Sequence, residues 1–177
     1  MKYILVICWS QVGDISSLQK EAFLVGQKIA QTKNILLYGW VQRGLMKEFA
    51  NGCRESGGKV QGYYSEFLEN CEDASKDWIE TVFLKTNEER KEQMFWKSDM
   101  CIVFPWWFGT FSELAELLLL KQGGFYNKPI YIYNKEGFYE NLSLFLGGLT
   151  QHQFIQKKDT QDVIILNKLK DIIAKID

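Results

Sequence analysis

Seven short segments of the chain carry the pattern expected of β-strands. Two of them, 2–8 and 100–104, are apolar without alternation, which is typical of parallel strands covered on both faces of a sheet. The other predicted strands are 34–39, 59–64, 78–84, 129–133 and 163–166. The pattern therefore predicts a largely buried sheet.

Helical patterns lie between these strands. Leu18, Ala22, Val25 and Ile29 recur at helical spacing and indicate an amphipathic helix packed on the sheet. Further helices are predicted at 45–56, at 86–98, from 110 onward, at 138–149 and at 168–176. Strands that alternate with helices favour a single α/β domain over residues 1–177, a three-layer, Rossmann-like, doubly wound and mainly parallel sheet.

The stretch from Met100 to Leu120 predicts a strand, a turn and a helix in one run. Pro105 ends the strand, Gly109 allows a turn, and Thr110 with Glu113 has the spacing of a capping box that opens the helix. A helix N-terminus after a glycine turn is a common anion site, although an ordinary strand–helix connection explains the same pattern. Ligands of doubly wound sheets bind at the carboxyl ends of strands, so the predicted loops at 9–14, 40–44 and 105–110 are the candidates.

Composition and charge exclude several classes of function. The net charge is −1 and the charged residues of both signs are interleaved, so no basic surface for nucleic acid is predicted. No apolar run approaches the length of a membrane span, and the N-terminal run is better explained as a strand than as a signal peptide. We therefore expect a cytoplasmic protein without a nucleic acid or membrane partner.

Cysteine and histidine usage gives no metal signature. Cys8, Cys53, Cys71 and Cys101 are too far apart for a C-x-x-C site, and reduced thiols in a cytosol are the simplest explanation. His152 is the only histidine, which excludes zinc sites built on paired histidines. We expect neither a metal nor an organic cofactor.

Several motifs in order make the chain resemble the LOG family. Pro105, Gly109, Thr110 and Glu113 match its Pro-Gly-Gly-x-Gly-Thr-x-x-Glu pattern. Other matching segments are Glu89-Arg90-Lys91 with Met94, Tyr38-Gly39, Gly44-Leu45-Met46, Asn127-Lys128-Pro129 and Gly137-Phe138-Tyr139. The family comprises Rossmann-like proteins long mislabelled lysine decarboxylases, many of which are phosphoribohydrolases of cytokinin nucleotides and other nucleoside 5′-monophosphates.

This resemblance implies roles for individual residues. Arg90 and Glu113 correspond to the catalytic arginine and glutamate, and loss of a base from ribose is chemistry that a carboxylate can assist. From the residues alone, Glu113 is already explained as the capping acid of its helix, and Arg90 has a solvated position in the first turn as its alternative. Lys91 and Glu116 are candidates for substrate binding, as is Arg43, which has a solvated loop position as its alternative.

Four tryptophans depart from the family pattern at glycine positions. Trp106 and Trp107 replace its Gly-Gly, Trp40 with Val41 replaces the last two glycines of Gly-Gly-Gly, and Trp9 replaces the glycine of Cys-Gly-Ser-Ser. Glycine lets the backbone approach a phosphate, and indole is the largest replacement. The four indoles are expected to converge at one site, where they either fill a disused cleft or line a pocket for a nucleobase or a cation.

Two functions follow from these expectations. The first is hydrolysis of the N-glycosidic bond of a nucleoside 5′-monophosphate or related nucleotide by Arg90 and Glu113, with Gly109, Thr110, Lys91 and Glu116 binding substrate. The second is binding of a nucleotide or another small ligand without hydrolysis. Lysine decarboxylation is less favoured, because no lysine stands out at a predicted site loop for attachment of pyridoxal phosphate. The resemblance also implies a homodimer, with the predicted helix of Arg90 near its interface.

Overall fold

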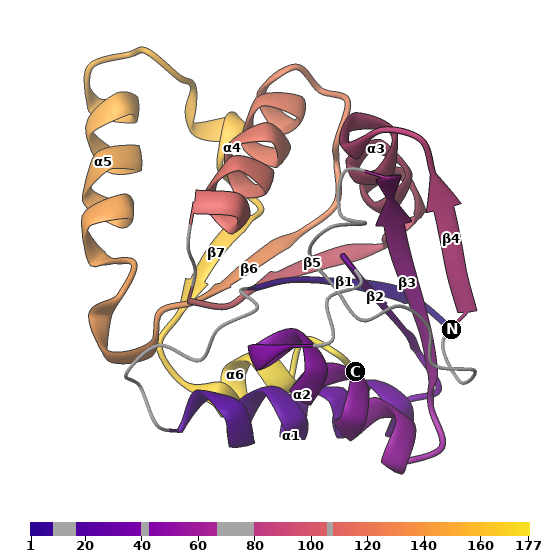
Figure 1. Cartoon of the computed structure of the whole chain (residues 1–177). Coiled ribbons are helices and arrows are strands. Elements are labelled where there is room, and N and C mark those ends of the chain that lie inside the picture. Colours follow the sequence, from indigo (N-terminus) through magenta and orange to yellow (C-terminus); the bar gives the residue numbers. More distant parts are fainter. Residues whose placement is uncertain (9–16, 40–42, 67–79, 106–107) are drawn as a thin grey trace.

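The computed structural model describes residues 1–8, 17–39, 43–66, 80–105 and 108–177. Its core is one sheet of seven strands in the order β4-β3-β2-β1-β5-β6-β7 (Figure 1). The strands are β1 (Tyr3–Ile7), β2 (Ile35–Tyr38), β3 (Lys59–Ser65), β4 (Glu80–Leu84), β5 (Met100–Val103), β6 (Ile130–Tyr133) and β7 (Val163–Leu166). Every neighbouring pair is parallel, so the predicted sheet is confirmed.

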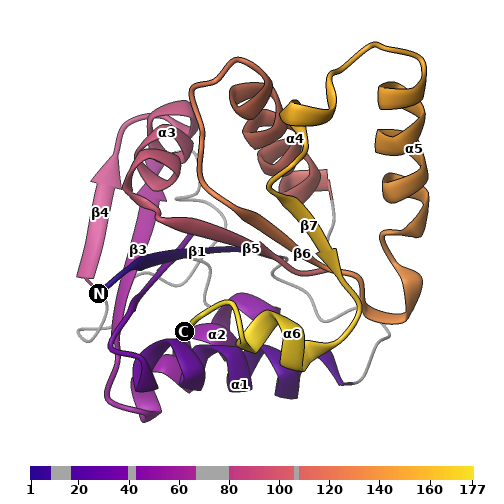
Figure 2. The ribbon, with the colours of Figure 1, turned by 180° about the vertical axis from the view of Figure 1, so that it is seen from behind.

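Helices cover both faces of the sheet, as the doubly wound prediction requires (Figures 1 and 2). On one face lie α1 (Leu18–Gln31), α2 (Gly44–Glu55) and α6 (Leu169–Ile173). On the other lie α3 (Asn87–Lys97), α4 (Phe108–Gln122) and α5 (Glu140–Gln151). Short 3₁₀ turns occupy Lys135–Gly137 and Lys157–Asp159. The result is a three-layer Rossmann-like architecture.

Strand order reverses between β1 and β5, which are neighbours in the sheet although helices and three other strands separate them along the chain. In such folds ligands bind outside the carboxyl ends of the strands at this point. β2, β1 and β5 end at Tyr38, Ile7 and Val103, so the connections that follow these residues start at the same edge of the sheet. The fold thus places the predicted site at this edge.

The helix predicted from its apolar spacing is confirmed. Leu18, Ala22, Val25 and Ile29 are all at most 3% exposed and belong to the apolar cluster between α1, α2 and the sheet. α1 and α2 cross so closely that a side chain at Gly26 would meet the carbonyl of Phe49. Glycine is required there because backbone occupies the space of a Cβ.

The opposite layer is less closed. α3 and α4 bury Met94, Phe95, Leu114 and Leu117 against the sheet. α5 contributes no buried residue of its own and stands apart from the sheet (Figure 2). No helix within the described ranges is long and apolar enough to cross a membrane.

Candidate functional site

α3 begins with a capping box that the sequence predicted correctly. The Oγ1 of Thr86 accepts a hydrogen bond from the backbone N–H of Glu89 at 3.1 Å, and the Glu89 carboxylate accepts one from the N–H of Thr86 at 3.3 Å. These bonds satisfy N–H groups that a helix N-terminus otherwise leaves unpaired. The fixed first turn directs Arg90 inward, and its side chain is only 8% exposed.

The guanidinium of Arg90 pairs with the carboxylate of Glu113 on α4. Nη2 lies 3.0 Å from Oε1, and the Glu113 side chain is 12% exposed. Nε donates to Oδ1 of Asn87 at 2.9 Å, and Nη1 donates to the sulfur of Met94 at 3.8 Å. A charge-assisted hydrogen bond between two nearly buried side chains fixes both groups in orientation. The solvated alternative for Arg90 is therefore wrong.

The capping role considered for Glu113 is also wrong. α4 begins at Phe108, which makes Thr110 its third residue rather than its cap, and Thr110 is only 2% exposed. Glu113 therefore lies inside the helix, where its Oε1 accepts from Arg90. The spacing of a capping box also occurs within helices, and the tertiary partner determines what the carboxylate binds.

Gly109 occupies the first turn of α4 and not a separate turn before it. A Cβ built at Gly109 meets no atom within 4 Å, and the residue is exposed. No described residue therefore packs against the position of a side chain at Gly109, which lies in the helix turn where the dipole favours an anion.

A second ion pair joins the same two helices. Nζ of Lys91 lies 2.6 Å from Oε2 of Glu116, and the two side chains are 12% and 34% exposed. The pair follows directly from sequence position, because Lys91 is next to Arg90 and Glu116 lies one helical turn after Glu113. Glu116 is thus half-buried in an ion pair, and its place at the border of the site stays a prediction.

The negative charge of Glu113 reaches two thiols of the central strands. Burial first, and the charge of Glu113 second, raise the pKa of Cys8 and of Cys101 well above the ordinary value. Cys101 lies on β5 and Cys8 directly follows β1. The carboxylate therefore lies near enough to these neighbouring strands, at which the sheet order reverses, for its charge to act on both thiols.

Tyr139 is a residue of this region whose role the sequence did not reveal. Its hydroxyl donates to the carbonyl of Phe104 at 2.6 Å, and its backbone N–H donates to Oδ1 of Asn134 at 2.6 Å. Tyr139 thereby ties the start of α5 to the end of β5, immediately before Pro105. The Gly137-Phe138-Tyr139 motif was recognisable in the sequence, but its contact with Phe104 was not.

The remaining predicted residues are placed only in part. Arg43 is exposed at the N-terminal boundary of α2 and makes no ion pair with any residue that the structure describes. Trp9, Trp40, Trp106 and Trp107 lie outside the described residues, so their convergence stays a prediction. Over the same described ranges, no group of three or more His, Cys, Asp or Glu side chains is arranged to hold a metal ion.

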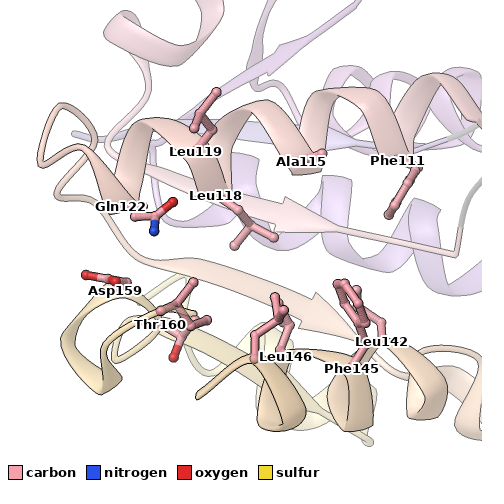
Figure 3. Close-up of a pocket in the computed structure, with 12 residues that line it drawn as sticks. Phe111, Ala115, Leu118, Leu119, Gln122, Leu142, Phe145, Leu146, Asp159 and Thr160 are labelled. Carbon is pink, nitrogen blue, oxygen red and sulfur yellow. The ribbon is translucent and has the colours of Figure 1, made fainter. Parts of the chain in front are cut away.

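The face of α4 opposite Glu113 borders an apolar groove. Phe111, Ala115 and Leu118 of α4 face Leu142 and Phe145 of α5 across a hollow of about 240 Å³ (Figure 3). Phe145 is 61% exposed. The lining of the groove includes none of the four residues of the two ion pairs. The homodimer expected from the family resemblance stays a prediction.

Comparison with known proteins identifies relatives of this arrangement. Residues 46–176 match the family model described as "possible lysine decarboxylase". Cytokinin riboside 5′-monophosphate phosphoribohydrolase LOG5 of Arabidopsis thaliana is 27% identical over 99% of this chain and 77% of its own length. A second relative is described as the probable cytokinin riboside 5′-monophosphate phosphoribohydrolase LOGL9 of Oryza sativa subsp. japonica. It is 30% identical over 86% of this chain and 67% of its own length.

Solved structures share the fold at lower identity. The molybdenum cofactor binding protein of Rippkaea orientalis is 20% identical with a TM-score of 0.74, over 99% of this chain and 94% of that one. The molybdenum cofactor carrier protein of Chlamydomonas reinhardtii is 20% identical with a TM-score of 0.73, over 99% and 95%. At this identity the likeness concerns the fold alone.

Proposed function

The chain belongs to the LOG family, and from this premise we propose that it is a phosphoribohydrolase that releases the base from a nucleoside 5′-monophosphate. The observation that carries the proposal is the buried ion pair of Arg90 and Glu113, whose atoms Nη2 and Oε1 lie 3.0 Å apart. It stands beside the strands at which the sheet order reverses, and the curated relatives named above are described as enzymes of this reaction.

The proposed reaction consumes water and breaks the bond between ribose C1′ and the base nitrogen. The departing base keeps the bonding electrons and gains a proton, while the water oxygen joins C1′ to give ribose 5-phosphate. Positive charge develops on the ribose ring in an oxocarbenium-like transition state. Glu113 supplies the fixed negative charge for that state, because Arg90 occupies Oε1 while Oε2 accepts no hydrogen bond from the described residues.

Arg90 has donors left for the substrate. A guanidinium carries five N–H groups, and three of them point at Asn87, Met94 and Glu113. The remaining two have no partner in the part of the chain that the structure describes. In the proposal they bind a ribose hydroxyl or phosphate oxygen, for which arginine is well suited.

Gly109 and Thr110 are the proposed phosphate-binding residues. Gly109 is exposed in the first turn of α4 and its Cβ position meets no described atom within 4 Å, while buried Thr110 anchors that turn. The unpaired N–H groups of such a turn attract an anion. The bulky Trp106 and Trp107 directly precede this turn in the sequence. Phosphate binding is therefore the part of the proposal that depends on where their side chains lie.

Lysine decarboxylation is not proposed, despite the description of the family model. A lysine that forms a Schiff base must present a free amine. Lys91 directly follows Arg90 in the sequence, and its Nζ is held 2.6 Å from the carboxylate of Glu116. The Lys91 amine is therefore held in an ion pair and is not available as a free amine.

The second candidate is ligand binding without hydrolysis, which the tryptophans favour. Indoles in place of glycines reduce room for a phosphate and add surfaces on which a planar ring can stack. The two structural neighbours are described as proteins of the molybdenum cofactor, so this cofactor is one ligand to test beside nucleotides.

A panel of nucleosides and their 5′-monophosphates distinguishes the two candidates. Chromatography of the products should reveal free base and ribose 5-phosphate in equal amounts from a monophosphate, with little release from the nucleoside that lacks the phosphate. The binding candidate instead predicts an unchanged nucleotide together with a rise in melting temperature, since a ligand at a hundred times its Kd stabilises the fold by ~2.7 kcal/mol.

A further inference from the structure

Gly39 lies directly against the guanidinium of Arg90. A Cβ built at Gly39 would stand 2.5 Å from Nη1 and 3.7 Å from Cζ of Arg90. Real Cβ atoms essentially never approach another heavy atom within 3.0 Å. The present position of the guanidinium is therefore compatible with glycine, and with no other residue, at position 39.

Backbone conformation does not explain this glycine. Among the described residues, the glycines with positive φ are Gly44, Gly57, Gly124 and Gly137, and Gly39 is not one of them. An L-residue can adopt the backbone angles at position 39 without the strain of a left-handed conformation. The remaining reason for glycine is the space that Arg90 occupies.

Three further residues hold the same guanidinium. Asn87 accepts from Nε at 2.9 Å, Glu113 accepts from Nη2 at 3.0 Å, and Met94 receives Nη1 at 3.8 Å. Together with Gly39 they form what we call the Arg90 cradle. Asn87, Met94 and Glu113 contact the guanidinium directly, and Gly39, just after β2, leaves space for it because it has no side chain.

We infer that Gly39 is a positioning residue for Arg90: the absent side chain lets the guanidinium reach Asn87 and Glu113 at once. Asn87 acts with it by fixing the Nε side of the planar group. That Gly39 sets the position of the guanidinium rests on the geometry of the cradle alone. That this position matters for catalysis rests on the proposed hydrolysis. Neither residue is required to touch the substrate.

The fold should tolerate a methyl group at position 39. Among the described residues, it would meet only the end of the long, flexible side chain of Arg90. At Gly26 and Gly52, in contrast, a Cβ would meet backbone carbonyl groups of the neighbouring helix. Gly39→Ala is therefore expected to displace the guanidinium rather than to unfold the chain.

Nuclear magnetic resonance of the arginine Nε–Hε groups tests this displacement without any substrate. The chain has three arginines, Arg43, Arg54 and Arg90, so loss of one signal in Arg90→Lys assigns the resonance. In the parent, the Arg90 Hε should exchange with water more slowly than those of the exposed Arg43 and Arg54, because Asn87 accepts its hydrogen bond.

Gly39→Ala and Asn87→Ala should each shift the Arg90 signal and accelerate its exchange. Gly147→Ala is the matched control, because a Cβ at this exposed glycine of α5 meets no described atom within 4 Å. It should leave the signal where it is. An Arg90 signal in Gly39→Ala that superimposes on that of the parent would overturn the inference.

Kinetics tests the catalytic meaning. Gly39→Ala should lower kcat on the order of 100-fold, since a displacement of about 1 Å can have this effect, and should change KM far less. In an Arg90→Lys background the same substitution should have no further effect; an equal loss there would contradict a role through Arg90. If the parent hydrolyses no nucleotide, the proposed function fails, and the Arg90 signal alone decides whether Gly39 positions the guanidinium.

Discussion

Nη2 of Arg90 and Oε1 of Glu113 lie 3.0 Å apart, although 23 positions separate the two residues in the sequence. Their side chains are 8% and 12% exposed. An ion pair so far from water has lost most of its hydration, so its members depend on each other. This dependence gives the first prediction.

Arg90→Met should destabilise the fold by ~3–5 kcal/mol, because it leaves the Glu113 carboxylate buried without its partner. Adding Glu113→Gln removes that charge, so it should raise the stability of the Arg90→Met variant. Urea unfolding of both single variants and the double variant measures the coupling.

The neighbouring pair of Lys91 and Glu116 provides the matched control on the same two helices. Glu116 is 34% exposed, so solvent screens its charge. Lys91→Met and Glu116→Gln should be coupled by ~1 kcal/mol or less. Equal coupling in the two pairs would contradict the account of a buried Arg90–Glu113 pair.

The buried thiols predict a loss of stability in alkali. The raised pKa of Cys8 and Cys101 keeps both thiols protonated in the folded chain, whereas an unfolded thiol loses its proton above pH ~8.5. Above this pH the unfolded state binds fewer protons than the folded state, so the free energy of unfolding should fall by ~1.4 kcal/mol per pH unit for each thiol.

Unfolding measured at several pH values between about pH 8 and pH 10 tests this dependence. Cys101→Ala should lower the stability at neutral pH and reduce the slope by the share of one thiol. An unchanged slope would mean that the Cys101 thiol titrates normally in the folded chain.

The crossing of α1 and α2 predicts a pair of opposite responses to the same substitution. Gly26→Ala should destabilise the chain by ~1–3 kcal/mol, because the new methyl group overlaps the Phe49 carbonyl. Gly147→Ala, which meets no atom within 4 Å in α5, should be neutral or stabilising by up to ~1 kcal/mol. If both variants lost melting temperature by the same amount, the close crossing of α1 and α2 would be contradicted.

The tryptophans predict a gain of function on removal. Trp40, Trp106 and Trp107 follow the carboxyl ends of β2 and β5, and Trp9 that of β1, which are neighbouring strands. Replacing Trp40, Trp106 and Trp107 together by glycine should raise the affinity for inorganic phosphate, measured by calorimetry. An affinity that stays the same in a folded triple variant would mean that these indoles do not obstruct the phosphate.

Apolar patterning predicted the strands closely. The segment 163–166 coincides with β7, and 59–64 differs from β3 by one residue. The central strands β1 and β5 are apolar throughout and buried at nearly every position, as parallel strands covered on both faces require, which makes them visible in the sequence. Residues 78 and 79 of the predicted fourth strand lie outside the described part of the chain, and the remaining 80–84 form β4.

Helix starts were predicted well where a local bond sets them. Thr86 and Glu89 bond each other's backbone, so α3 starts at Asn87, one residue after the predicted start, with Thr86 as its N-cap. α4 starts two residues before Thr110, and α5 starts at Glu140, two residues after its predicted start. Before α5, the side chain of Asn134 binds the N–H of Tyr139, a contact that no helical pattern contains.

The candidate site was predicted by family resemblance rather than by pattern. Arg90 and Glu113 came from matching motifs, and local rules explained both residues otherwise. Arg90 lies on α3, Glu113 on α4, and Gly39 directly after β2, so the spacing along any one element does not encode their proximity. The aromatic residues of the same region also differ in burial, which their residue type does not predict. Tyr126 and Tyr139 are buried, whereas the side chain of Phe125 is 65% exposed.

Release of free base from a nucleoside 5′-monophosphate, compared between the parent and Glu113→Gln, tests the central claim most directly. The account predicts release by the parent and a loss of ~10²–10⁴-fold in the variant, because the amide keeps the shape of the carboxylate but not its charge. The variant must retain the parent's far-ultraviolet circular dichroism. Release that continues undiminished in Glu113→Gln, or its absence from the parent with every nucleotide tested, would contradict the account.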